Sequence, residues 1–268
     1  MNGLSAAASY RCTFPRLITS WRKAFQPRVA AISPRQALYF GFIQISGFCC
    51  AEYNTCDVNS GRHEDQSGGA WAALRDAQMS ATLLPMVGWS TNADRAQGCD
   101  VHPPAKQDCA RRLANSALAL VYNESIAWRS PRFLSQVALP SGSVTITLSD
   151  ISPKGLKSVF PFNYQHTRGA SGTGPEVPIF DCAAHDKAGP GTCAWAAVKL
   201  ANAGWVNATI TVLSGSSSVK FTPKVNHTST MVMNRPIATA YGWGSVPMLS
   251  LYDAETELPV IGWNETIA

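Results

Sequence analysis

The chain has 268 residues, of which 46% are hydrophobic and 15% are charged, and this describes a globular protein rather than a disordered or fibrous one. The formal net charge of +5 is spread along the chain without a run of Lys and Arg, so we expect no nucleic-acid partner. No stretch approaches the roughly 20 apolar residues of a membrane span, so none is expected.

The first third of the chain alternates between helical and strand-like patterns. A helix is predicted from Tyr10 onward, because apolar residues fall on one helical face. These residues are Phe14, Leu17, Ile18, Trp21 and Phe25. Residues 38–46 (LYFGFIQIS) predict a mostly buried strand, and the polar, glycine-rich residues 54–69 predict a loop.

The alternation continues to about Tyr122. A helix is predicted over 70–81 and a strand near 83–87. Prolines at 103–104 suit the start of a further helix, because the first turn needs no backbone N–H. Its predicted inner face carries Cys109, Leu113, Ala117, Leu120 and Val121. Strand alternating with helix predicts an α/β layer.

After about Ser130 the pattern changes to short runs in which apolar and polar residues alternate. The runs cover 144–148, 206–213, 219–222, 230–233 and 238–243, with turn residues between them. Such runs are typical of an antiparallel β-sandwich. We therefore expect an α/β domain over residues 1–128 and a β-sandwich domain over residues 129–268.

Four Asn-x-Ser/Thr sites accompany eight cysteines. The candidate glycosylation sites are Asn123, Asn207, Asn226 and Asn264. Together with the cysteines they favour an oxidising, glycosylating compartment. The first residues lack a basic stretch followed by an apolar one, so no signal peptide is predicted. We therefore expect the natural N-terminus to lie upstream.

A glycine-rich loop separates Cys182 from Cys193, and a disulfide across this loop is preferred to a zinc site with His185. The histidines are otherwise scattered, so no metal site is predicted. The six remaining cysteines leave about 15 connectivities open.

The strongest candidate for chemistry is the histidine in residues 100–107 (DVHPPAKQ). His102 stands just before a predicted helix and two residues after Asp100. This arrangement can present a general base, because a carboxylate hydrogen bond holds the imidazole in one tautomer. Three alternative orienting carboxylates are Asp94, Asp108 and Glu52, and spacing alone does not choose between them.

No convincing nucleophile accompanies this histidine. Ser46 follows a predicted strand and precedes a glycine, but the next residues do not predict the helix that a nucleophile turn requires. Cys49 and Cys50 fit structural or oxidised cysteines better than thiol nucleophiles. The residues alone therefore predict half of an esterase site.

Several blocks of the chain carry a family resemblance. They are residues 10–22 (YRCTFPRLITSWR), 40–45 (FGFIQI), 71–78 (WAALRDAQ), 100–107 with Arg112-Leu113, and the closing motifs Tyr241-Gly-Trp, Leu251-Tyr252 and Leu258-Pro259. In this order they are similar to the family patterns Y-x-C-x-F-P-x-L-I-x-x-W-R, F-x-x-V-Q-L, W-x-x-L-R-x-A-Q, D-I-H-P-x-x-K-Q with R-L, and Y-A-W, L-Y-N and G-L-P. The chain resembles the sialate O-acetylesterases, a branch of the SGNH-type serine hydrolases.

The resemblance implies a partial SGNH, flavodoxin-like three-layer domain and roles for individual residues. His102 matches the catalytic histidine, Asp100 its acidic partner, and Asn2 an asparagine of the oxyanion hole. The nucleophilic serine of the family's G-Q-S-N-M block has no counterpart in this sequence, nor has the glycine that supplies a second oxyanion donor. The family uses no metal or cofactor and works in lysosomes or outside the cell.

The resemblance thus implies an esterase that removes acetyl groups from O-acetylated sialic acid or a related sugar, with His102 serving a serine outside this sequence. We expect the chain alone to be inactive, because losing one triad member costs several orders of magnitude in rate. Two other interpretations remain open. The β-rich region could be a carbohydrate-binding or scaffold module of an inactive paralogue, or the sequence could be an incomplete gene product.

Overall fold

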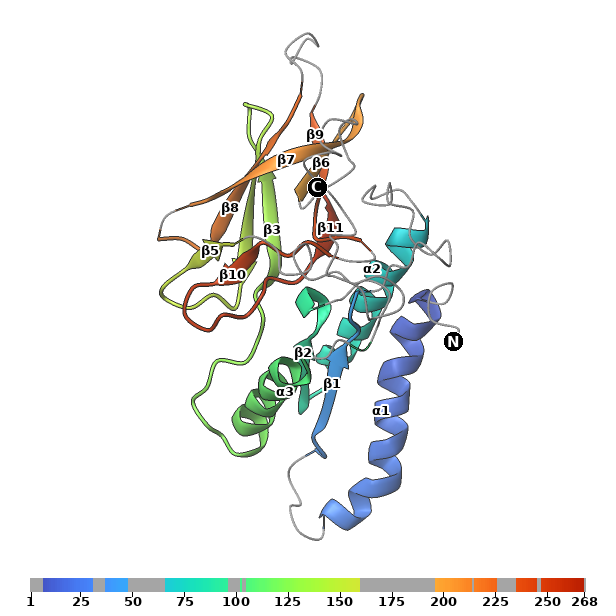
Figure 1. Cartoon of the computed structure of the whole chain (residues 1–268). Coiled ribbons are helices and arrows are strands. Elements are labelled where there is room, and N and C mark those ends of the chain that lie inside the picture. The colour runs from blue at the N-terminus through green and yellow to red at the C-terminus, as the bar shows by residue number, and fades with distance from the viewer. Residues whose placement is uncertain are drawn as a thin grey trace, which may run out of the picture.

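The computed structural model describes residues 7–30, 37–47, 66–95, 102, 105–159, 196–213, 215–225, 235–244 and 247–267. The described residues form a helix-rich part up to residue 121 and a strand-rich part from residue 132 onward, which stands above the helices in Figure 1. None of the described helices combines the length and the apolar character needed to cross a bilayer.

Two parallel strands form the centre of the helix-rich part. β1 (Phe40–Gln44) pairs with β2 (Val87–Thr91), with Phe40 opposite Val87 and Gln44 opposite Thr91. Parallel pairing requires a crossover connection, and α2 (Gln66–Met79) is part of it. The expected α/β layer is therefore confirmed, whereas the larger three-layer SGNH domain stays a prediction.

β2 begins later than the strand predicted at 83–87. Pro85 has no N–H to give to a ladder, and Met86 has a positive φ of 54°, so neither residue continues an extended strand. Leu83, which suggested the earlier start, is 87% exposed. The predicted position was wrong because the apolar residues before Pro85 belong to a 3-10 helix, Ser80–Leu83, and its exit.

Two helices lie on opposite faces of the parallel pair, as Figure 1 shows for α1 (Ala7–Ala30) and α3 (Lys106–Val121). Phe42 of β1 packs edge-to-face against Phe14 of α1, with ring centroids 5.2 Å apart. On the other face, a Cβ added at Gly88 of β2 would lie 2.3 Å from Ser116 Oγ of α3. Glycine therefore allows α3 to approach the strand closely.

The apolar face of α1 is only partly buried. Phe14 and Ile18 are 8% and 0% exposed, in agreement with the sequence prediction. Leu17, Trp21 and Phe25 are 42%, 48% and 52% exposed, so the predicted apolar face of the helix is not buried along its whole width. Helical periodicity predicts which residues share a face but not which of them another element covers. Trp21 contacts Phe40 of β1, with ring centroids 5.7 Å apart, and still remains about half exposed.

The buried face of α3 is more polar than predicted. Its buried residues are Cys109, Arg112 and Ser116, whereas Val121 is 38% exposed. Ser116 Oγ lies 2.7 Å from the hydroxyl of Tyr39. Two of the three buried side chains are polar, so a search for apolar periodicity could not find them.

The strand-rich part contains one sheet of seven strands and a separate pair. The pair is β5 (Leu156–Ser158) antiparallel to β10 (Leu251–Asp253). The sheet has the order β11-β9-β6-β7-β8-β4-β3, with every neighbouring pair antiparallel. Its strands are β3 (Arg132–Ala138), β4 (Val144–Ser149), β6 (Ala196–Leu200), β7 (Gly204–Val212), β8 (Ser218–Pro223), β9 (Pro236–Tyr241) and β11 (Trp263–Thr266). The predicted run 230–233 lies outside the described residues.

This sheet curls toward a barrel instead of forming two packed sheets. Residues 204–207 of β7 pair with β6 and residues 208–212 pair with β8, so one strand joins what would otherwise be two sheets. At the open ends, Gln136 of β3 donates to Glu265 O of β11 at 2.9 Å and accepts from Thr239 Oγ1 of β9. The prediction of antiparallel strands was correct, but the β-sandwich was wrong, because local alternation does not specify how strands are shared between sheets.

Candidate functional site

The carboxyl ends of the two parallel strands carry several buried polar side chains. Along the chain these are Gln44, Ser46, Thr91, Asn92 and Asp94, each at most 6% exposed. In open α/β sheets ligands bind outside the carboxyl ends of the strands. This edge is therefore the first place to look for a functional site.

Hydrogen bonds tie the ends of β1 and β2 to α2. Thr91 Oγ1 donates to Gln44 Oε1 at 2.8 Å, and the backbone N–H of Ala93 donates to Thr91 Oγ1 at 3.1 Å. Gln44 Nε2 donates in turn to the carbonyl of Arg75 at 3.1 Å. These hydrogen bonds connect β2 to β1 and β1 to α2, so the two strand ends are held in a fixed arrangement.

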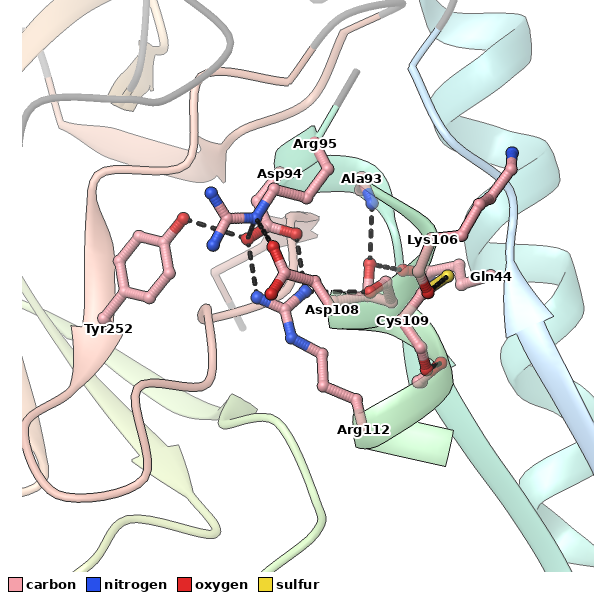
Figure 2. A network of polar contacts seen from close by, with 11 residues as sticks. Gln44, Ala93, Asp94, Arg95, Lys106, Asp108, Cys109, Arg112 and Tyr252 are labelled. Atoms are coloured by element: carbon pink, nitrogen blue, oxygen red, sulfur yellow. Dashed lines mark hydrogen bonds and ion pairs between the residues drawn. The ribbon is translucent and has the colours of Figure 1, made fainter. Parts of the chain in front are cut away.

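Asp94 is the centre of a second polar network, drawn in Figure 2. Arg112 of α3 donates to both carboxylate oxygens, at 2.7 Å from Nη1 and 2.9 Å from Nη2. The hydroxyl of Tyr252 on β10 donates to Asp94 Oδ2 at 3.1 Å. Asp94 and Arg112 are 1% and 3% exposed, so the pair is inaccessible to water. The network thus joins the end of β2, α3 and the strand-rich part.

The environment keeps the two partners of Asp94 protonated. Burial tends to lower the pKa of Arg112, but the hydrogen bonds and charge of Asp94 outweigh it, and the pKa lies above its ordinary value. Burial, reinforced by the charge of Asp94, raises the pKa of the Tyr252 hydroxyl. Arg112 therefore remains a cation and Tyr252 a donor across the physiological range of pH.

A further ion pair links the residues on either side of His102 in sequence. Arg95 ends the 3-10 helix Ala93–Arg95, and its Nε lies 3.0 Å from Asp108 Oδ2 in the first turn of α3. The same Nε lies 3.5 Å from Asp94 Oδ2. Arg95 therefore connects the Asp94 network to Asp108, and these two residues lie before and after His102 in the sequence.

The predicted catalytic residues are only partly described. His102 is exposed and precedes α3. Asp100, Asn2 and the alternative carboxylate Glu52 lie outside the described residues. The other two alternatives, Asp94 and Asp108, are engaged by Arg112 and Arg95 respectively. The pairing of His102 with Asp100 consequently stays a prediction.

Ser46, the nearest approach to a nucleophile in the sequence, is 2% exposed. Its Oγ has no hydrogen-bond partner among the described residues. A buried hydroxyl is out of reach of a substrate approaching from solvent, so Ser46 is a poor candidate for the nucleophile. Cys49 and Cys50 lie outside the described residues.

The predicted modification sites have different surroundings. Asn123 is exposed and Asn264, on β11, is partly exposed. Asn207 is 6% exposed within β7, and its burial argues against a glycan there because a glycan must lie in solvent. Asn226, Cys182 and Cys193 lie outside the described residues, while Cys12 and Cys109 are free thiols.

A small cavity lies where α2 meets the strand-rich part. It measures about 30 Å³, and its lining includes Gln44, Arg75, Trp243 and Leu249. Arg75 donates to the carbonyl of Gly244 across this junction, and burial lowers the pKa of its guanidinium to about 9. The volume suits a water molecule rather than a sugar ring. The cavity is therefore part of the junction and not a substrate pocket.

Sequence reasoning missed the roles of Arg112 and Tyr252. Both stood in the blocks that carry the family resemblance, but without an assigned function. A charged residue between Cys109 and Ser116 on the buried side of a helix was the available signal, since a buried arginine requires a partner. Its partner, Asp94, could not be chosen from spacing.

Comparison with known proteins gives a fold likeness. No family model matches the chain, and no curated protein matches it. The crystal structure of a carbohydrate acetylesterase from Xanthomonas citri superimposes on 97% of this chain with a TM-score of 0.63 and 20% sequence identity. This chain spans about half of that protein, 46% of its length. The described architecture is therefore similar to one part of a carbohydrate acetylesterase.

Proposed function

We infer that the chain is part of a carbohydrate acetylesterase, a carboxylic ester hydrolase that removes O-acetyl groups from sugars. The observation that carries this proposal is the fold likeness to such an enzyme over 97% of the chain. It is supported by the position of His102, which follows the carboxyl end of β2 and precedes α3. The resemblance of residues 100–107 to the family's histidine block favours sialic acid as the sugar.

The proposed mechanism is acyl transfer through a serine that lies outside this sequence. His102 takes the serine proton as the oxygen attacks the acetyl carbonyl, and it returns that proton to the departing sugar hydroxyl. It then activates a water molecule, which releases acetate from the acyl-enzyme. Asp100 orients the imidazole, and Asn2 helps to stabilise the oxyanion. These steps use no metal or cofactor.

The chain would then contribute the histidine half of the site, next to the carboxyl ends of β1 and β2. The ends of β1 and β2 are fixed by the Gln44–Thr91 hydrogen bond, so the site would be built on a rigid edge. We also propose that the protein acts in a lysosome or outside the cell. The candidate glycosylation sites Asn123 and Asn264, which reach the surface, are compatible with this location.

The test is a His102→Ala substitution in a form of the protein that carries the serine block. Acetate release from O-acetylated sialic acid and from a neutral acetylated sugar is measured for both forms. We expect a loss of about 10⁴-fold or more, as for other triad histidines. Arg111→Ala, an exposed change on α3 outside the histidine block, is the matched control.

Near-normal acetate release by the His102→Ala form would overturn the proposal. Retention on immobilised glycans without any ester hydrolysis by the unsubstituted form would instead favour a carbohydrate-binding paralogue. A preference for the neutral sugar would keep the esterase but replace its substrate.

A further inference from the structure

We propose that the outer edge of β1, the side that faces away from β2, is the docking site for a parallel β-strand. The strand would come from the part of the proposed enzyme that carries the nucleophilic serine, which we call the serine-bearing part. This inference rests on the proposed function and deepens it, because it names the surface through which the chain joins the other half of the site.

The backbone of β1 is paired on one side. The N–H of Phe40 donates to the carbonyl of Met86 at 3.0 Å, toward β2. Backbone groups of successive residues in a strand point to opposite sides, so the N–H groups of Gly41 and Ile43 point away from β2. Among the described residues β1 pairs with β2 alone, and neither of these two N–H groups has a partner. An unpaired edge of this kind can accept a further strand.

Gln78 of α2 marks where this edge is closed. Its Oε1 accepts from the N–H of Ile45 at 2.8 Å, and its Nε2 donates to the carbonyl of Ile43 at 3.5 Å. The side-chain amide thus takes the place that a peptide group of a neighbouring strand would have. Gln78 is 8% exposed, so this end of the edge is covered. An incoming strand is therefore left with the backbone of Gly41 and the N–H of Ile43.

The position of α1 indicates what belongs at the open edge. Phe42 packs against Phe14 of α1, and Gln44 donates to the carbonyl of Arg75 in α2. Phe42 and Gln44 are two residues apart, so both helices cover the same face of β1. α2 connects β1 to β2, and such crossovers between parallel strands are almost always right-handed. A helix on the same face that leads into β1 with the same hand comes from a parallel strand on the side away from β2.

Apolar side chains beside the edge are partly uncovered. A Cβ added at Gly41 would lie 3.2 Å from Leu113 of α3, so residues 41 and 43 face the side of α3. Ile43 on that side is 39% exposed, and Leu17 and Trp21 of α1 are 42% and 48% exposed. Figure 1 shows α1 beyond β1, on the side away from α3. A strand at this edge would add apolar burial to its main-chain hydrogen bonds.

The serine-bearing part fits this edge better than a second copy of the chain does. A sheet needs three or more strands, or helix packing, for independent stability, and parallel sheets are covered on both faces. This chain spans 46% of the acetylesterase that it resembles in fold, so more than half of that protein is available to extend the sheet. A second copy related by a two-fold axis perpendicular to the sheet would pair antiparallel, whereas α1 predicts a parallel neighbour.

The test is hydrogen exchange, measured residue by residue on the chain alone and on a form that carries the serine block. In the chain alone, the N–H groups of Gly41 and Ile43 should exchange at least about 10²-fold faster than that of Phe42. In the longer form they should slow by about the same factor. Phe42, which faces β2, and Ile45, which is held by Gln78, are internal controls that should exchange slowly in both forms.

A substitution at the edge gives a second measurement. Ile43→Pro removes the outward N–H and leaves the ladder with β2 intact, because proline is tolerated on the unpaired side of an edge strand. In the longer form it should speed the exchange of Gly41 by about tenfold or more. Ile43→Thr is the matched control, since threonine is also β-branched and keeps the N–H, and it should leave Gly41 protected.

The inference is overturned if Gly41 and Ile43 are as protected as Phe42 in the monomeric chain alone, or if they remain unprotected in the longer form. Protection that appears only as the chain alone dimerises would assign the edge to a second copy and would also contradict it. The exchange needs no turnover. Protected amides without acetate release would therefore support the docking site and remove the esterase, and acetate release with unprotected amides would do the reverse.

Discussion

Arg112 and Asp94 form a bidentate ion pair, at 2.7 and 2.9 Å, between α3 and the end of β2. Both side chains are buried, and Tyr252 completes the set of partners from the strand-rich part. A buried pair of this kind contributes little compared with apolar packing, but breaking it leaves a charge in the interior without compensation. Its value to the fold is therefore best measured by removing one partner at a time.

Arg112→Met should lower the free energy of unfolding by about 3 kcal/mol, because the buried Asp94 carboxylate then keeps only the longer ionic contact with Arg95 at 3.5 Å. Asp94→Asn in the same chain should restore part of the loss, since the remaining amide is neutral and can still accept from Tyr252. Urea denaturation of the two single variants and the double variant measures the coupling. A cost below about 1 kcal/mol for Arg112→Met would show that the pair is screened like a surface one.

Tyr252 should make the chain sensitive to alkaline pH. Its pKa is raised in the folded state, so its contribution to stability is present below the ordinary tyrosine pKa of about 10 and is lost as pH rises above that value. Tyr252→Phe should be less stable at pH 8 but lose less stability between pH 8 and pH 11. Urea midpoints at these pH values test this. The pKa of Tyr241 is also raised, and Tyr241 is present in both proteins. Equal losses would therefore assign the alkaline sensitivity to other groups such as Tyr241 and would contradict the prediction.

Gly88→Ala should separate α3 from the parallel strands. The added methyl would lie 2.3 Å from Ser116 Oγ and 2.4 Å from Tyr39 Oη, which is closer than carbon and oxygen can approach. We expect a loss of about 1–3 kcal/mol from overpacking, measured by thermal or urea denaturation. Ser116→Ala in the same chain should recover part of the loss, and Ser116→Ala alone is the control. An unchanged stability of Gly88→Ala would mean that α3 does not pack this closely.

The exposed stripe of α1 should promote self-association. Leu17, Trp21 and Phe25 lie four residues apart and are 42–52% exposed, so they form a continuous apolar strip. Leu17→Lys with Phe25→Lys should lower the association measured by sedimentation or light scattering, while changing stability by only about 0.5 kcal/mol each. Ile18→Lys is the contrasting variant, because Ile18 is fully buried and its replacement should unfold the helix-rich part. Unchanged association of the double variant would count against the strip.

Local patterns in the sequence predicted much of the secondary structure. The β-branched and aromatic run at 38–46 contains β1, and the alternating run at 144–148 lies within β4, whose inward residues Val144 and Ile146 are fully buried. Both predictions depend only on the period of the side chains, which is set by the backbone. Five strands were not predicted: β3, β5, β6, β10 and β11. β5 and β10 have three residues each, which is too few to show a period.

Contacts between distant residues were the part that sequence could not supply. β7 pairs with β6 along its first residues and with β8 along its last ones. This shared strand joins the strands that were expected to form a sandwich into one curled sheet. The polar network has the same character, because Arg112, Asp94 and Tyr252 come from three elements. The spacing of His102 pointed to the stretch of sequence between β2 and α3, but it did not reveal the polar network that joins the ends of these elements.

The hydroxyl of Tyr252 also bears on how this protein can be dissected. A fragment ending near residue 128 would keep Asp94 and Arg112 but lose the tyrosine, and Ala93 would lose the apolar neighbours it shares with the strand-rich core. Water would reach the ion pair, and an exposed pair contributes only about 0–1 kcal/mol. Either half expressed separately should therefore be less stable than the intact chain, which makes the undivided protein the right starting material for labelling and crystallisation.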